Sequence, residues 1–244
     1  MSEANGAPKP FKAAIIQDFS TTKPWGPMTI DATTGYIRRG ISHAKVDHYR
    51  AADGEALPPA TDYDLFVLTG GTVNLLEDEK PEWAIRVLDL IREVSVLPNT
   101  KIVAFCWGHQ AVHYALGGSL GVLAEGPRIA VEEMNFTTEG KEFFGKDTLL
   151  LQKYHKRYVT ALAPGFTALA ERCEISSSVE KGFITFQGHP DLSRETVKIL
   201  VETDDGLYKQ NETTARSPCG KLFSSDTADD GGEVWLKIMD FVRK

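Results

Sequence analysis

Apolar residues in the first half of this chain form short continuous runs separated by helical segments. The runs have strand length and lie at residues 11–19, 46–49, 64–69 and 101–105. Between them, residues 30–43 begin with helix-start residues such as Asp31, and residues 81–96 carry apolar side chains at the 3.6-residue spacing of a helix. Continuous rather than alternating apolar runs are typical of parallel strands covered on both faces. The pattern therefore predicts an α/β fold with a doubly wound, mostly parallel sheet.

The second half of the chain has a different pattern. Shorter strand-like runs occur at residues 130–137, 147–152 and 183–186, and we expect them to form a small mixed or antiparallel extension. A helix is predicted at 193–202, a polar loop rich in Thr, Ser, Asp and Gly at 203–232, and an amphipathic C-terminal helix at 233–243. Residues 1–10 read as a flexible tail. We expect residues 11–244 to be a single domain whose sheet is flavodoxin-like, with helices on both faces.

Composition narrows the class of protein. The chain has 34 acidic and 27 basic residues, a net charge of −7, which disfavours a partner with a phosphate backbone. Three cysteines, Cys106, Cys173 and Cys219, lack the C-x-x-C spacing of a zinc site, and their odd number argues against a disulfide framework. The N-terminal residues have no signal-peptide pattern, and no window reaches membrane-spanning length. We expect a cytoplasmic protein that binds neither nucleic acid nor membrane.

The first chemical signal lies at residues 101–110, where a buried strand runs directly into a helix at Cys106. Strand, sharp turn and helix are the geometry of a nucleophile elbow, which raises one side chain above the sheet. Gly108 has no Cβ, so the helix backbone can approach the strand that it has just left. The free amides of the new helix favour thiolate over thiol. A lone cysteine after a strand is also a common buried apolar residue, so the elbow leaves both interpretations open.

A second signal lies downstream, where the apolar run at 182–186 leads to His189 and Asp191. A cysteine, a histidine and a carboxylate are the groups that activate a thiol through an oriented base. The strand at 64–69 also leads into a Gly-Gly pair at 70–71. Ligands of parallel α/β sheets bind beyond the carboxyl ends of the strands, which is where Cys106 and this pair are expected.

Four segments together resemble the class I glutamine amidotransferase family. They are Leu68–Gly71, Phe105–Gln110, Tyr154–Val159 and Phe186–Asp191. Their order and spacing agree with the family over about residues 11–200. The resemblance implies a hydrolase that cleaves γ-glutamyl amide bonds of glutamine, γ-glutamyl peptides or glutathione-type conjugates by way of a thioester.

The resemblance also implies roles for single residues. Cys106 would attack the γ-carbonyl carbon, His189 would take its proton and return it to the leaving amine, and Asp191 would orient the imidazole. The backbone amides of Gly71 and Trp107 would form the oxyanion hole. The substrate-binding candidates that follow from the matched segments are Gly70, Gln110, Tyr154, His155 and Arg157.

Two positions depart from the family pattern. Asp191 stands where glutamate is usual, and its side chain is one methylene shorter, so it could fall short of the His189 ring. Arg157 stands where aspartate is usual, which is compatible with a changed substrate preference. Arg157 could bind a carboxylate or be solvated. Gln110 could contact the glutamyl group or serve as an exposed or capping amide.

A zinc site is the other chemistry that the sequence suggests. His109 and His113 have the i, i+4 spacing of a helical zinc site, but Gln110 replaces the glutamate of that motif and no third ligand is evident. We therefore predict no metal and no cofactor.

The favoured function is a stand-alone γ-glutamyl hydrolase acting on a small molecule, because no synthetase domain is recognised in the chain. One alternative is a glutaminase subunit that passes ammonia to a separate synthetase partner. Another is a binding module on the same fold that has lost activity. The sequence gives no oligomeric state.

Overall fold

The computed structural model describes residues 10–203 and 229–244, so the predicted tail and most of the predicted polar loop at 203–232 lie outside the described residues. A seven-stranded sheet has the order β2-β1-β3-β4-β11-β10-β9. Its strands are β1 (Lys12–Ile16), β2 (Lys45–Tyr49), β3 (Leu65–Leu68), β4 (Lys101–Phe105), β9 (Thr167–Ala168), β10 (Ile175–Ser178) and β11 (Phe183–Phe186). The first five strands in the sheet order pair in parallel. Strand β10 is antiparallel to both of its neighbours, β11 and β9. The predicted doubly wound, mostly parallel α/β fold is confirmed.

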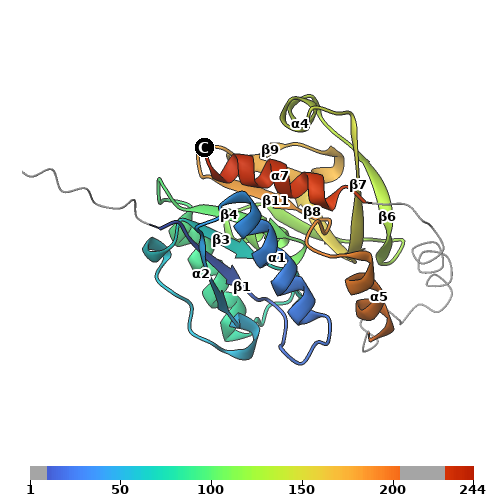
Figure 1. The fold of residues 1–244 in the computed structure, drawn as a ribbon. Helices are drawn as coiled ribbons and strands as arrows, with labels where there is room; N and C mark the ends of the chain where they lie inside the picture. Colours follow the sequence, from blue (N-terminus) through green and yellow to red (C-terminus); the bar gives the residue numbers. More distant parts are fainter. Residues whose placement is uncertain (1–9, 204–228) are drawn as a thin grey trace, which may run out of the picture.

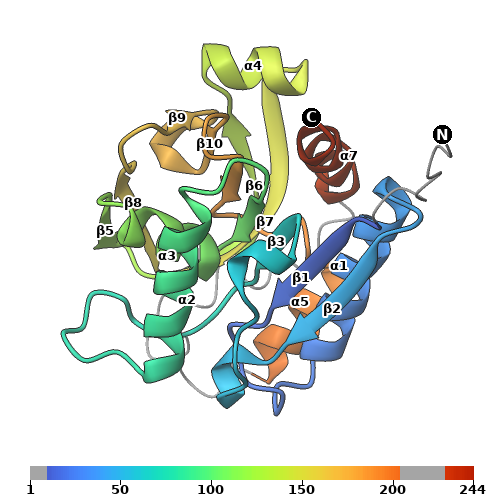
Figure 2. The ribbon, with the colours of Figure 1, turned by 90° about the vertical axis from the view of Figure 1, so that its left-hand side faces the viewer.

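Helices cover both faces of this sheet (Figures 1 and 2). On one face lie α1 (Gly26–Gly40) and α7 (Gly231–Val242), and on the other lie α2 (Glu82–Val94) and α3 (Trp107–Ala115). Side chains alternate along each strand, so Val103 and Phe105 join the first core and Ile102 joins the second. Because both faces are buried, every position of the strand must be apolar, which explains the continuous runs.

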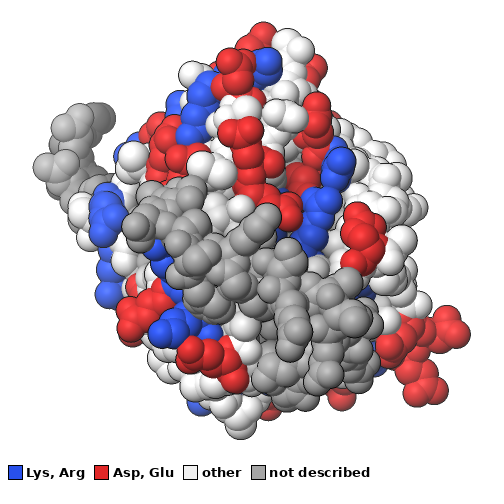
Figure 3. Space-filling model, turned by 90° about the vertical axis from the view of Figure 1, so that its right-hand side faces the viewer, with Lys and Arg blue, Asp and Glu red and all other residues white. Residues whose placement is uncertain are grey.

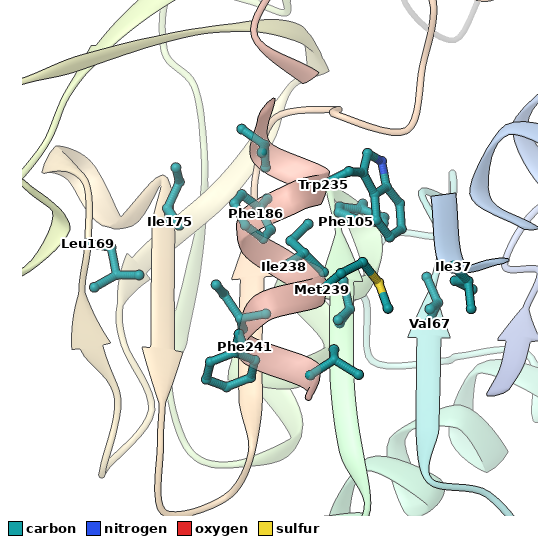
Figure 4. Packing of buried hydrophobic residues seen from close by; sticks show 14 of the residues in the cluster. Ile37, Val67, Phe105, Leu169, Ile175, Phe186, Trp235, Ile238, Met239 and Phe241 are labelled. Carbon is teal, nitrogen blue, oxygen red and sulfur yellow. The ribbon is translucent and has the colours of Figure 1, made fainter. Parts of the chain in front are cut away.

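The C-terminal helix α7 closes the first core. Trp235, Ile238 and Met239 project from it toward the sheet, where Phe105 and Phe186 lie beneath them (Figure 4). The rings of Trp235 and Phe105 meet edge to face at a centroid distance of 5.3 Å. The amphipathic stripe predicted near the C-terminus is therefore core packing on the sheet.

Helix α1 corrects one prediction. It begins at Gly26, several residues before the predicted start near Asp31, and includes Pro27 in its first turn. Proline is tolerated there because the first amides of a helix have no intrahelical acceptor.

The helix predicted at 193–202 is confirmed as α5 (Arg194–Glu202), whose N-cap Ser193 accepts a hydrogen bond from the backbone amide of Thr196 at 3.1 Å.

The predicted antiparallel extension consists of two small sheets. They pair β5 (Ser119–Val122) with β8 (Arg157–Ala161) and β6 (Arg128–Asn135) with β7 (Thr148–His155), and α4 (Thr138–Phe144) joins β6 to β7. Short 3₁₀ helices lie at Ala51–Asp53, Ala60–Asp62 and Glu171–Cys173. The run at 183–186 is β11, which belongs to the main sheet and has mixed pairing: it is parallel to β4 on one side and antiparallel to β10 on the other.

The surface view in Figure 3 shows Asp and Glu side chains lying among Lys and Arg side chains on the described part of that face. Charge of both signs is interspersed there, and it does not form a continuous basic surface. Within the described ranges, no helix is both long and apolar enough to cross a bilayer.

Candidate active site

Cys106 occupies a sharp turn between β4 and α3. Its backbone has φ 47° and ψ −101°, a conformation that is costly for a residue with a Cβ. The backbone amide donates to the carbonyl oxygen of Phe186 at 2.8 Å, which fixes the turn to the neighbouring strand. Its Sγ lies 3.7 Å from the carbonyl oxygen of Tyr154. The elbow predicted from the sequence is present, and it holds the thiol at the edge of the sheet.

Gly108 makes this turn possible because α3 passes close to Leu68 at the end of β3, whereas the sequence predicted a close approach to β4. A Cβ built on Gly108 would lie 2.7 Å from Cβ and 2.8 Å from the carbonyl oxygen of Leu68. The close approach is therefore to β3, the neighbouring strand, and not to β4, which the chain has just left. The amide of Gly108 also donates to the carbonyl oxygen of Thr69 at 3.1 Å.

His189 follows β11 and lies beside Cys106. Its amide donates to the carbonyl oxygen of Gln152 at 2.9 Å. Its Nδ1 lies 3.1 Å from Oδ1 of Asp191, so the shorter carboxylate does reach the ring. A Cβ built on Gly70 would lie 3.0 Å from Cε1 of His189 and 3.8 Å from Cβ of Cys106, so Gly70 fits only as glycine between nucleophile and base.

Two opposing effects determine the charge of His189. Burial by itself lowers the pKa of the imidazole, whereas the charges of Asp191 and Cys106 and their hydrogen bonds to the ring raise it. The second effect wins, and the pKa of His189 is raised from 6.5 to about 10. At neutral pH the ring of His189 is therefore an imidazolium.

Two backbone amides lie next to Cys106. The amide of Trp107 is the first of α3 and has no intrahelical acceptor. The amide of Gly71 donates to no backbone or side-chain acceptor among the described residues. A Cβ on Gly71 would lie 2.5 Å from the carbonyl oxygen of Asp18 and 3.1 Å from Cγ of Trp107, so only glycine fits between them. The indole of Trp107 fixes the same loop by donating to the carbonyl oxygen of Val73 at 3.0 Å.

These groups line one cleft. It is lined by the predicted site residues Gly70, Gly71, Cys106, Tyr154, His189 and Asp191. The other lining residues are the apolar Phe19, Trp25, Leu192 and Leu200, with Lys23, Thr29, Thr72 and Thr203. The predicted positions at 70, 71, 106, 154, 189 and 191 are thus brought together.

Three predicted substrate contacts lie outside this cleft. Gln110 is buried and donates through Nε2 to the carbonyl oxygen of Arg157 at 2.8 Å and to Oε1 of Gln187 at 3.2 Å. It is therefore not an exposed amide, and these bonds hold its Nε2 against the protein. Arg157 is also buried, and its Nη2 donates to the carbonyl oxygen of Thr72 at 2.9 Å. Solvation of Arg157 is excluded, and its guanidinium anchors the loop that follows Gly71.

His155 lies behind the cleft as well. Its Nδ1 is 3.0 Å from the carbonyl oxygen of Arg157, and burial lowers the pKa of its imidazole to about 4. The ring is therefore neutral at physiological pH, and Nδ1 donates the hydrogen bond. Through this bond His155 supports the backbone at the start of β8.

His109 and His113 belong to a buried hydrogen-bond network. Nδ1 of His109 lies 2.8 Å from Oγ1 of Thr185, and Nε2 of His113 lies 2.9 Å from Oγ of Ser176. The two hydroxyl oxygens are 2.9 Å apart. This network joins α3 to β10 and β11, which explains the i, i+4 spacing. No group of three or more His, Cys, Asp or Glu side chains in the described parts of the chain could hold a metal ion.

The sequence did not predict four apolar residues that line the cleft, nor Gln152. Phe19 and Trp25 come from the β1–α1 loop, Leu192 precedes α5, Leu200 lies on α5, and Gln152 lies on β7. The apolar Trp25, placed in a loop between two prolines, was the one local signal for these apolar residues, because a large apolar residue in a loop needs a packing partner.

Comparison with known proteins gives a consistent family. No family model matches the chain. Glutamine amidotransferase-like protein chry6 of Gibberella zeae is 35% identical over 230 residues, which cover 94% of each chain. Gamma-glutamyl peptidase 4 of Arabidopsis thaliana is 27% identical over 68% of this chain and 70% of that protein. Among solved structures, a glutamine amidotransferase from Thermotoga maritima has a TM-score of 0.75 at 20% identity, covering 97% of this chain and 100% of that one.

Proposed function

The chain belongs to the family of glutamine amidotransferase-like proteins, and from that premise we propose that it hydrolyses γ-glutamyl amide bonds. Cys106 is the nucleophile, His189 the acid and base, and Asp191 the residue that orients the imidazole. The observation that carries the proposal is the meeting of Cys106 and Asp191 at the His189 ring, beside the amides of Gly71 and Trp107. The same geometry argues against a binding module that has lost activity, because a protein that only binds a ligand would not need a thiol, an imidazole and a carboxylate in this arrangement.

The reaction begins from the charged pair. The thiolate of Cys106 attacks the γ-carbonyl carbon, and the amides of Gly71 and Trp107 donate to the oxyanion. The His189 imidazolium gives its proton to the leaving nitrogen, the C–N bond breaks, and the γ-glutamyl thioester remains on Cys106. Water then attacks the thioester as His189 accepts its proton. The C–S bond breaks, and glutamate leaves with the amine already released.

Two observations favour hydrolysis over a role as ammonia donor. Nucleophile, base, carboxylate and both amides come from this one chain, and the raised pKa of His189 does not depend on a second protein. Relatives named gamma-glutamyl peptidases also match two thirds or more of the chain. A lone hydrolase needs a site preorganised by its own chain. An ammonia donor is better kept inactive until its synthetase binds, because ammonia released earlier is lost.

The test is glutamate release by the purified chain from glutamine, glutathione and a glutathione S-conjugate. We expect release from at least one, with an amine larger than ammonia preferred. Cys106→Ala should abolish release, and the matched variant Cys173→Ala should retain it. Release that appears only after a second protein is added would support the ammonia-donor function instead. Release that survives in Cys106→Ala would reject the mechanism.

A further inference from the structure

The position of His189 defines where the leaving group lies. Because His189 protonates the leaving nitrogen, that nitrogen and its substituent must lie on the His189 side of Cys106. The chain continues on this side through Asp191 and Leu192 into α5, which contributes Leu200 to the cleft. Leu192 and Leu200 therefore border the cleft on the side of the leaving amine.

The wall on this side is apolar. Tyr154, Leu192 and Leu200 belong to a hydrophobic cluster that is separate from the two main cores, and Trp25 packs against it. All four residues also line the cleft. The cluster thus presents one edge to the cleft, next to the catalytic histidine.

The β1–α1 loop continues this apolar surface on the opposite side of Cys106, where the carbonyl oxygen of Asp18 lies against Gly71, because Trp25 packs on the same cluster. The rings of Phe19 and Trp25 pack at a centroid distance of 4.4 Å, and Phe19 is buried. A Cβ on Gly26 would lie 2.8 Å from the ring of Phe19, so the start of α1 holds this ring in place. The apolar wall is therefore a fixed surface, built before any substrate binds.

We propose that this wall, formed by Phe19, Trp25, Tyr154, Leu192 and Leu200, is a subsite for an apolar or aromatic group on the leaving amine. The inference rests on the proposed γ-glutamyl hydrolase function and names its substrate class: γ-glutamyl amides whose amine carries a hydrocarbon chain or ring. A larger apolar group gains affinity by burying its surface on the wall. In a closely fitting apolar pocket, one more methylene group on the substrate raises kcat/KM by about tenfold or more.

The experiment uses γ-glutamyl amides of ethylamine, butylamine and phenethylamine, whose leaving groups have similar basicity, with glutamine as the reference. We expect kcat/KM to rise at least about tenfold from the ethyl to the phenethyl amide, which corresponds to about 1.4 kcal/mol. Hydrolysis of all amides with no such rise would overturn the subsite and leave the proposed function intact. No hydrolysis of any of these amides, nor of glutathione or its S-conjugate, would overturn the proposed function itself.

Matched variants locate the effect. Leu200→Asn should reduce the phenethyl-to-ethyl ratio of kcat/KM at least about fivefold, by loss of apolar contact. Val201→Asn is the control, because Val201 packs on the same cluster from the next position of α5 without lining the cleft. Thr203→Val, at an exposed position at the end of α5 that lines the cleft, should raise the ratio without altering the core. Equal loss in Leu200→Asn and Val201→Asn, with no gain in Thr203→Val, would reject the subsite.

Discussion

The backbone amide of Cys106 donates to the carbonyl oxygen of Phe186 at 2.8 Å. Phe186 ends β11, and Cys106 directly follows β4, its parallel neighbour in the sheet. The chain therefore leaves both strands at the same edge, and His189 arrives beside the thiol by the shortest route. The proposed nucleophile and base are thus held by two buried neighbouring strands, which suits a site that must hold its geometry closely.

Cys106 should be the first described cysteine to react with iodoacetamide at neutral pH. It lines the cleft next to the charged ring of His189, whereas burial raises the pKa of the Cys173 thiol and keeps it protonated. Brief labelling followed by peptide mass analysis measures the order of modification. His189→Ala should slow labelling of Cys106 and leave Cys173 unaffected. Earlier modification of Cys173 would contradict the assignment of the nucleophile.

Replacement of Asp191 by Asn should weaken catalysis without abolishing it. The carboxylate raises the pKa of His189 against the effect of burial, so in Asp191→Asn the imidazole loses its proton at a lower pH. We expect kcat to fall by roughly 10²–10⁴, less than in Cys106→Ala. Titration of the His189 ring by NMR should show its pKa near 10 in the native protein and lower in the variant. An unchanged titration would show that Asp191 does not control the ring.

Gly108→Ala should destabilise the protein and damage the elbow. The new methyl group would meet the Cβ and carbonyl oxygen of Leu68 at 2.7 and 2.8 Å, and neither can move without shifting β3. Overpacking of this kind costs about 1–3 kcal/mol in the free energy of unfolding, measured with urea. Gly35→Ala is the control, because nothing lies within 4 Å of a Cβ at that position in α1. It should stabilise the helix by about 0.5–1 kcal/mol, and equal effects of the two changes would reject the argument.

The free energy of unfolding should fall as the pH drops from about 6.5 to about 4. Burial lowers the pKa of His113 and of His155 to about 4, whereas the unfolded chain binds these protons near pH 6.5. The unfolded state therefore gains protons first, and each histidine contributes a slope of up to about 1.4 kcal/mol per pH unit in that window. His189 has the opposite sign: its raised pKa stabilises the fold below pH 6.5, and this contribution is lost as the pH rises through about 10.

Urea unfolding at pH 7, 6 and 5 tests the slope. His113→Gln should show a smaller loss of stability over this range than the native protein, since one buried titrating group is gone. The exposed His43→Gln should follow the native protein. Identical slopes in all three proteins would show that the buried histidines do not govern the acid sensitivity.

The sequence alone determined the parallel half of the fold and the position of the thiol. Strands β1, β3 and β4 are buried on both faces, so each had to be a continuous apolar run, and a run of this kind is visible locally. Cys106 was visible for the same reason, because the change from strand to helix takes place at that residue. Helix α5 also begins at a local feature, because the capping bond of Ser193 joins residues three apart in the sequence.

The tertiary structure alone decided how the remaining pieces meet. The run at 183–186 could join either sheet, and its pairing with β4 depends on contacts between residues distant in the sequence.

Ser176, Ser177 and Ser178 gave no strand signal, yet they form a buried strand because the hydroxyl of Ser176 bonds inside the core and the backbone pairs with β11. Arg157 and Gln110 are polar and were expected at the substrate, but their partners are buried carbonyl oxygens that only the folded chain brings within reach. The apolar wall of the cleft was likewise decided by folding, since it joins a loop near residue 25 to a helix near residue 200, and no local pattern encodes a surface shared by segments so far apart.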